Sequence, residues 1–264
     1  MNNLPNPKEF KSFKADLSKR IKFDDVEPNY DLNKIYEAMK KNTIPRGRVS
    51  QLLNTEILKS FSNIQSVLKK CILFDKMNNS IAIAIKEDEE IKTIAIHKSK
   101  SKEGDLIKWK TLGSKSYIPY SIRDNSKVVF VLVGMKEYLL MELMELDYIV
   151  MQSDSIVKGI HFNDQWLEEI KPQIKDKLIV YINENDRSSQ ECINPIKEEL
   201  QNHSQVLEID INNLFLFHII GVGNGGRAEP LTKGYDFIDL CNAYNDIESI
   251  QTTIKEFIQM ELKQ

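Results

Sequence analysis

The chain has 264 residues, of which 41% are hydrophobic and 28% are charged, a composition typical of a globular protein with a substantial buried core. No apolar run approaches the length of a membrane span and the opening residues are polar, so we expect a cytoplasmic protein with no membrane partner. The formal net charge of -3 hides an asymmetry, since residues 1–127 carry 25 basic and 16 acidic side chains whereas residues 128–264 carry 11 and 23. This asymmetry suggests a basic surface for a polyanion and an acidic half for divalent cations, although lysine-rich solvated faces would give the same counts.

Residues 1–70 are predicted to form a helical N-terminal region, because apolar side chains recur there at helical spacing. The stretch NTIPRGRVS interrupts this pattern at Pro45 and Gly47. Arg46 and Arg48 in the break could contact phosphate, or they could simply keep a turn soluble.

Residues 71–126 are predicted to form a small β-rich subdomain. Two β-rich runs, 81–85 and 91–96, are separated by the acidic KEDEE and indicate a hairpin. The next stretch, IKWKTLGSKSYIPYSI, predicts irregular β structure in which lysines are interleaved with aromatic residues: Lys108, Trp109, Lys110, Lys115, Tyr117 and Tyr120. Lysines neutralise phosphates and aromatic faces stack on unpaired bases, so the mixture suits single-stranded nucleic acid, but a half-buried strand with a solvated lysine face would look the same.

Residues 127–264 are predicted to form an α/β domain with a parallel sheet. Continuous apolar runs predict strands at 127–133, 147–153, 176–182 and 205–211, and helical patterns lie at 135–146 and 188–201. Strands without alternation that are spaced by helices imply a parallel sheet buried on both faces, with a ligand site beyond its carboxyl ends. The amphipathic segment 245–264 is expected to cover this sheet, with a dimer contact as the alternative.

The residues that follow these strands resemble the Toprim domain of topoisomerases, bacterial-type primases and related nucleases. Residues 134–137 (Gly-Met-Lys-Glu) follow the first strand, where the family has E-G-x-x-D, and residues 183–186 (Asn-Glu-Asn-Asp) follow the third, where it has D-x-D. The stretch KGYDFIDL resembles the final lysine and aspartate element of primase-like members. The segment 107–122 resembles the region ahead of the Toprim core in primases of phages and mobile elements. The resemblance covers about residues 75–245 and implies a Toprim-like domain that acts in DNA replication.

The resemblance also implies which residues would carry chemistry. The family's first-motif glutamate acts as general acid or base, and its aspartates hold magnesium. At the glutamate position this chain has Val133, and at the D-x-D positions it has Asn183 and Asn185. A valine can neither transfer a proton nor bind a cation, and an asparagine supplies a carbonyl oxygen without charge.

Four carboxylates remain as candidates for a weakened site. Glu137 stands at the first-motif aspartate position and is the candidate catalytic residue, while Glu184 and Asp186 flank the D-x-D positions. If Mg²⁺ is bound, we expect Glu137, Glu184 and Asp186 as its ligands, with Asp154 as a further candidate.

These departures lead us to expect a nucleic-acid-binding, primase-like protein that is catalytically weakened or inactive. Losing the proton-transfer group alone typically forfeits a factor of about 10² to 10⁴ in rate. Two alternatives stay open: a protein-interaction module on the same fold, and an active Mg²⁺-dependent enzyme of nucleotidyl transfer or phosphodiester cleavage with rearranged carboxylates.

The glycine-rich stretch IIGVGNGG, residues 219–226, satisfies the G-x-G-x-x-G spacing of phosphate-binding loops. Such a loop should open directly into a helix, but Pro230 and Gly234 fall where that helix would run. We therefore predict a loop between the sheet and KGYDFIDL, from which Arg227 could contact a phosphate backbone near Asp186.

The cysteines and histidines point to no site. The four histidines are scattered without a pair at i, i+4, so a histidine metal site is not expected. Three cysteines lie far apart without C-x-x-C spacing and are predicted to be free and buried: Cys71, Cys192 and Cys241.

Overall fold

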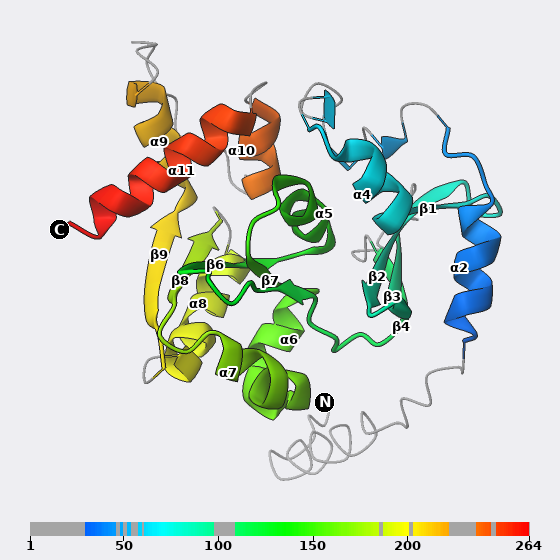
Figure 1. The fold of residues 1–264 in the computed structure, drawn as a ribbon, viewed down its shortest axis with the longest axis horizontal. Coiled ribbons are helices and arrows are strands. Elements are labelled where there is room, and N and C mark those ends of the chain that lie inside the picture. The colour runs from blue at the N-terminus through cyan, green and yellow to red at the C-terminus, as the bar shows by residue number, and fades with distance from the viewer. Residues whose placement is uncertain are drawn as a thin grey trace, which may run out of the picture. The chain divides into compact units, whose positions relative to one another are not determined.

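The computed structural model describes residues 30–45, 48–49, 52–53, 58–59, 61–97, 109–184, 187–200, 203–221, 236–243 and 247–263. Leu32–Gln264 form one compact unit. This unit has an α/β fold in which helices pack around two β-sheets (Figure 1).

The first sheet has four antiparallel strands in the order β1-β2-β3-β4. Its strands are β1 (Ile72–Asp75), β2 (Ser80–Glu87), β3 (Glu90–His97) and β4 (Trp109–Gly113). The predicted hairpin is present between β2 and β3, where Asp88 and Glu89 both have positive φ, at 45° and 69°. Two positive φ values match the right-handed twist of the paired strands.

Two helices contribute to the cores on the two sides of this sheet. Because side chains alternate along a strand, Ala82 and Ala84 of β2 pack in a cluster with Tyr36 of α2 (Leu32–Lys40). The alternate residues, including Ile83, pack in another cluster with α4 (Ile64–Cys71). These are helices within the predicted helical region 1–70, of which residues 1–29 and several later positions lie outside the described part.

The second sheet has five strands in the order β5-β7-β6-β8-β9. They are β5 (Tyr120–Ser121), β6 (Val128–Val133), β7 (Tyr148–Met151), β8 (Leu178–Asn183) and β9 (Gln205–Asp210). Strands β7, β6, β8 and β9 are parallel, and β5 is an antiparallel edge strand, so the sheet is mixed. The apolar runs predicted as strands are explained by burial on both faces, since the interior of β6 is buried throughout.

Helices cover both faces of this second sheet (Figure 1). One face carries α5 (Met135–Met144), α9 (Ile211–Gly221), α10 (Phe237–Ala243) and α11 (Ile247–Glu261). The other face carries α6 (Asp154–Lys158), η2 (Ile160–Phe162), η3 (Trp166–Ile170), α7 (Lys171–Gln173) and α8 (Arg187–Leu200). None of the helices in the described part of the chain is long and apolar enough to cross a bilayer.

The C-terminal helix α11 confirms the predicted amphipathic cover. Ile250, Ile254 and Phe257 are buried against the cluster that includes α5 and the sheet. Burying each of these side chains stabilises the fold by roughly 1.5–3 kcal/mol. The three cysteines are free and buried, as predicted.

The side chain of Gln152, just after β7, ties the two sheets together. Its Nε2 donates to the carbonyl oxygen of Tyr117 at 2.7 Å, and it lies 3.3 Å from both the Ser114 carbonyl and Thr93 Oγ1. Thr93 belongs to β3 of the first sheet, and its hydroxyl also donates to the Ser114 carbonyl at 2.7 Å. The chain that crosses from one sheet to the other is thus fixed by polar contacts from both.

Candidate functional site

The strand order defines a divergence point at the carboxyl edge of the five-stranded sheet. From β6 the chain runs through α5 to β7, while from β8 it runs through α8 to β9 on the other side of β6. Helices α5 and α8 lie on opposite faces. In open α/β sheets this arrangement leaves a crevice at the strand ends where ligands bind. The residues directly after β6 and β8 therefore form the candidate site.

After β6, the Glu137 carboxyl packs directly against Gly134. Gly134 has φ of 132°, a conformation that L side chains rarely adopt, and its N–H donates to the Met151 carbonyl at 2.8 Å. A Cβ at Gly134 would overlap Oε2 of Glu137. The Glu137 carboxyl is therefore folded back over the start of α5, where it accepts a hydrogen bond from its own backbone N–H. Only 5% of Glu137 is exposed.

Burial controls the protonation of this carboxyl. Removal from water raises the pKa of Glu137 to about 8, and the nearby carboxylates of Asp236 and Asp239 act in the same direction. Its backbone hydrogen bond and Lys136 lower the pKa, but by less. At neutral pH, Glu137 is therefore mostly a neutral acid, and a metal ion would have to displace its proton before the carboxylate could act as a ligand.

After β8, Asn183 is held by the neighbouring strand. Its Nδ2 donates to Oε1 of Glu208 on β9 at 2.7 Å, and the other oxygen of Glu208 forms an ion pair with Lys197 of α8. The Asn183 Oδ1 is buried and has no hydrogen-bond partner among the described atoms. The end of β8 thus carries a buried carbonyl oxygen that receives no hydrogen bond from the described atoms.

Glu184 and two aspartates converge on the start of α10. The Phe237 N–H donates to Oε1 of Glu184 at 3.2 Å. Asp239 N–H donates to Asp236 Oδ1 at 2.7 Å, and Asp236 N–H lies 3.3 Å from Asp239 Oδ2, which is a reciprocal capping arrangement. These acids therefore cap the helix of the KGYDFIDL motif, a role that the sequence pattern did not predict.

The predicted metal ligands are only partly brought together. Glu137 and Glu184 both lie beside the start of α10. The Asp236 carboxylate raises the pKa of Glu137, and the Phe237 N–H donates a hydrogen bond to Glu184. Asp186 lies outside the described residues, and within them no group of three acidic, histidine or cysteine side chains is placed to hold a metal ion. Asp154 begins α6, on the opposite face from α5.

The predicted nucleic-acid contacts are distributed over more than one surface. Lys108 and Arg227 lie outside the described part of the chain. Trp109 is half-buried, packs against the core and makes an edge contact with His97 at 4.9 Å between ring centroids. Lys110 is exposed and, as the next residue of β4, points to the other face of the strand. Trp109 and Lys110 therefore do not form one platform.

Lys115 lines a polar groove of 550 Å³ formed by residues 114–117, 155–156, 159 and 162–165, together with Lys92 and nearby acidic residues. At its rim, Phe162 is 80% exposed, and its ring lies 3.9 Å from that of His161 between centroids. The amino-acid sequence does not single out Phe162, because one aromatic residue beside a histidine forms no pattern that predicts exposure.

Hydrogen bonds hold the two walls of the polar groove in place. Asn163 Nδ2 donates to the Ser116 carbonyl at 2.8 Å. The Gln165 side chain pairs with both backbone groups of Ile118, at 2.7 and 3.1 Å. A groove fixed in this way needs little ordering when a ligand binds.

The glycine-rich stretch begins inside a helix. Helix α9 extends from Ile211 to Gly221, and residues 222–235 lie outside the described part. A phosphate-binding loop of this type follows a strand and opens a helix, whereas here its first glycine ends one. The arrangement agrees with the prediction that this is not a dinucleotide fingerprint.

Comparison with known proteins finds one solved structure of similar fold and no related sequence. No family model matches the chain, and no curated protein matches it. Among solved structures, a DNA primase domain from Pseudomonas aeruginosa aligns with a TM-score of 0.45 and 11% sequence identity, over 85% of this chain and 76% of that one. A likeness at this level establishes neither a family nor an activity for the chain.

Proposed function

We propose that the chain binds single-stranded nucleic acid at the polar groove and that the carboxyl edge of its five-stranded sheet does not carry out efficient phosphoryl chemistry. The observation that carries the proposal is the exposed Phe162 ring at the rim of a groove that Lys115 also lines. An exposed aromatic face stacks on bases of any sequence, and a lysine beside it contacts the phosphate between them.

The charged side chains of the groove determine how much phosphate contacts contribute to the affinity for nucleic acid. Lys92 already pairs with Glu87 at 3.2 Å and with Glu90 at 2.6 Å. Asp164 and Glu169 also line the groove, so its lysines are opposed by acidic groups. We therefore expect one or two phosphate contacts, and the logarithm of the association constant should fall with the logarithm of salt with a slope between about -0.7 and -1.4. Stacking, rather than charge, would supply most of the affinity.

The state of Glu137 argues against strand chemistry. Its carboxyl is buried, neutral at pH 7 and bonded within its own helix turn, and the preceding strand ends in Val133 instead of a proton-transfer group. Without such a group we expect any residual activity to be lower by a factor of about 10² to 10⁴ than in an enzyme that has one.

Fluorescence anisotropy of a labelled thymidine 20-mer tests the binding site. Replacing Phe162 by alanine should weaken binding roughly 5- to 150-fold, the equivalent of about 1–3 kcal/mol for one stacked base. Phe162→Trp should retain binding, because it keeps an aromatic face. Met77→Ala is the matched control, since Met77 is 96% exposed but lies in the turn between β1 and β2, outside the groove.

The same titration tests the rest of the proposal. Binding should be equal in Mg²⁺ and in EDTA, and an abasic oligonucleotide of the same length should bind much more weakly. Equal affinities of the wild type and Phe162→Ala, or no binding at low salt, would remove the proposed site.

A second candidate, metal-dependent phosphoryl transfer, is favoured by the unpartnered Asn183 Oδ1. Together with Glu184, and with Asp186 two residues further along the sequence, this oxygen could contribute to a Mg²⁺ site. Mn²⁺- or Mg²⁺-dependent cleavage or primer synthesis that is lost in Glu184→Gln, with oligonucleotide affinity unchanged, would establish this candidate. Absence of activity in the wild type over a range of metal concentrations would favour the binding protein.

A further inference from the structure

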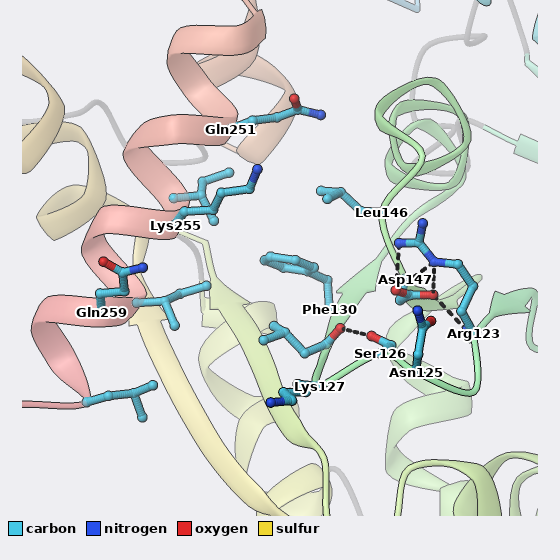
Figure 2. A pocket seen from close by; sticks show the side chains of 14 residues that line it. Arg123, Asn125, Ser126, Lys127, Phe130, Leu146, Asp147, Gln251, Lys255 and Gln259 are labelled. Atoms are coloured by element: carbon cyan, nitrogen blue, oxygen red, sulfur yellow. Dashed lines mark hydrogen bonds and ion pairs between the residues drawn. The ribbon is translucent and has the colours of Figure 1, made fainter.

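A cavity of 580 Å³ lies between α11 and the first residues of β6 (Figure 2). Its lining residues on β6, Val128 and Phe130, lie roughly 10 to 17 Å from Val133 at the carboxyl edge, at about 3.3 Å per residue. Neither the proposed nucleic-acid groove nor the carboxylates near α10 belong to it.

The walls of this cavity are mostly apolar. Figure 2 shows Phe130 of β6 and Leu146 facing the space beside α11. Ile254 and Ile258 line it from α11, and Leu262, which is 48% exposed, lies beyond the end of that helix. The volume falls within the range of about 300 to 1,000 Å³ that is usual for small-molecule sites, and such sites are lined in the same way.

Cationic side chains line the same cavity. Lys127 and Lys255 both border it, and neither forms a salt bridge with any carboxylate in the described part of the chain. The cavity's one carboxylate, Asp147, is already bound by Arg123 through Nη2 at 2.8 Å and Nε at 3.0 Å. The remaining charge is therefore positive, beside an apolar interior.

We propose that this cavity binds a small amphiphile with one anionic head group and an alkyl body, of the class of medium-chain carboxylates. The alkyl body would lie against Phe130, Ile254 and Ile258. The carboxylate would lie at the polar margin beside one of the two lysines, Lys127 or Lys255, which Figure 2 shows on opposite sides of Phe130. A neutral apolar molecule would gain nothing from the positive charge at the margin, and a fully polar anion would leave the apolar walls in contact with water.

Isothermal titration calorimetry of the full chain with decanoate, below its micelle concentration, tests this site. We expect saturable binding of one decanoate per chain, and at least tenfold weaker binding of 1-decanol, which has the same chain length and no charge. The double variant Lys127→Gln/Lys255→Gln should weaken decanoate binding at least tenfold and leave decanol binding unchanged.

Two further variants make the result specific to this cavity. Leu146→Trp, which adds volume at the wall, should weaken decanoate and decanol alike, whereas Lys175→Gln, an exposed lysine outside the cavity, should change neither. The far-ultraviolet circular dichroism of each variant should match that of the wild type. No saturable decanoate binding, equal binding of decanol, or binding that survives both cavity changes would overturn the proposal.

Discussion

The two ends of the parallel strands use their polar side chains in opposite ways. At the carboxyl end, Glu137 and Glu184 bind the starts of helices within the chain itself. At the amino end, Lys127 and Lys255 border an apolar cavity and have no carboxylate partner among the described residues. Strand order therefore predicts where a site can form, but the side chains after each strand decide whether space is left for a ligand.

Gly134→Ala, at the carboxyl end of the parallel strands, should cause the largest loss of stability. The new side chain would need φ of 132° and would overlap the Glu137 carboxyl, so we expect the free energy of unfolding to fall by about 3–5 kcal/mol. Urea denaturation measures the loss. In the double variant with Glu137→Ala the overlap is gone, and the loss should be smaller than the sum of the two single effects.

Gly159→Ala is the control for this change. A Cβ there would lie 3.5 Å from the Ser155 carbonyl, an ordinary contact, and the φ of -109° suits alanine. Its effect should stay below about 1 kcal/mol. If Gly134→Ala were equally mild, Glu137 could not occupy the space over Gly134.

Glu137→Gln should change how stability depends on pH. The folded-state pKa of about 8 lies above the ordinary value of 4.5, so the protonated acid stabilises the fold fully below pH 4.5, and this stabilisation is lost as pH rises through 8. The advantage of Glu137→Gln over the wild type should therefore grow between pH 5 and pH 8, by on the order of 3 kcal/mol. Chemical denaturation at four pH values measures it, with the exposed Glu256→Gln on α11 as control. Parallel pH profiles for wild type and Glu137→Gln would contradict a buried neutral carboxyl.

Asp147→Asn tests the one neutralised charge at the amino end. Burial alone would raise the pKa of Asp147, but hydrogen bonds from the Arg123 side chain and backbone N–H hold it below its ordinary value of 3.8. The stabilisation is therefore present above pH 3.8 and is lost as pH falls below it. We expect a loss of about 1–2 kcal/mol at pH 7 that becomes smaller as pH falls below 3.8.

An exposed ion pair provides the reference for this measurement. Lys158 and Glu191 are 3.1 Å apart with side chains 51% and 43% exposed, so Glu191→Gln should change stability by less than about 0.5 kcal/mol. An equally small effect of Asp147→Asn at pH 7 would mean that the Arg123 pair contributes no more than a surface contact.

Lys255→Ala should have the smallest effect on folding. Its side chain is exposed and has no salt-bridge partner in the described part of the chain, so its removal should change the free energy of unfolding by less than about 0.5 kcal/mol. Thermal denaturation without ligand measures this. A loss above 1 kcal/mol would show that Lys255 has a structural role and is not available to an anion.

The elements that the sequence predicted best have strong and simple patterns. The continuous apolar runs at β6 and β8 could only be buried on both faces, and the repeated apolar side chains of α11 fit one helix face. Several unpredicted elements are short: β1 has four residues, and the segment between β7 and β8 is divided among α6, η2, η3 and α7. Such pieces are stabilised by tertiary contacts, as when Trp166 is fully buried, and not by a period of their own. Helix α9, with 11 residues, was also not predicted.

The sequence predicts where the candidate residues lie along the strands, but not their side-chain conformations or their protonation. The position of Glu137 after the first parallel strand follows from chain order alone. Its fold-back over Gly134 depends on a side-chain conformation and on burial by α10, which is about 100 residues away in sequence. The exposure of Phe162 likewise depends on how the helical segment 154–173 packs as a whole, and no local sequence pattern predicts that exposure.

The bridge made by Gln152 affects how the molecule can open. One amide holds the crossing chain at Tyr117 and Ser114 and reaches Thr93 of the four-stranded sheet. Separating the sheets would break the contacts of the half-buried Gln152 amide with both of them, including its contact with the fully buried Thr93, so neither sheet can move away without losing the same set of bonds. In hydrogen exchange, the central amides of β3 and β7 should therefore open in one cooperative event, although the strands belong to different sheets.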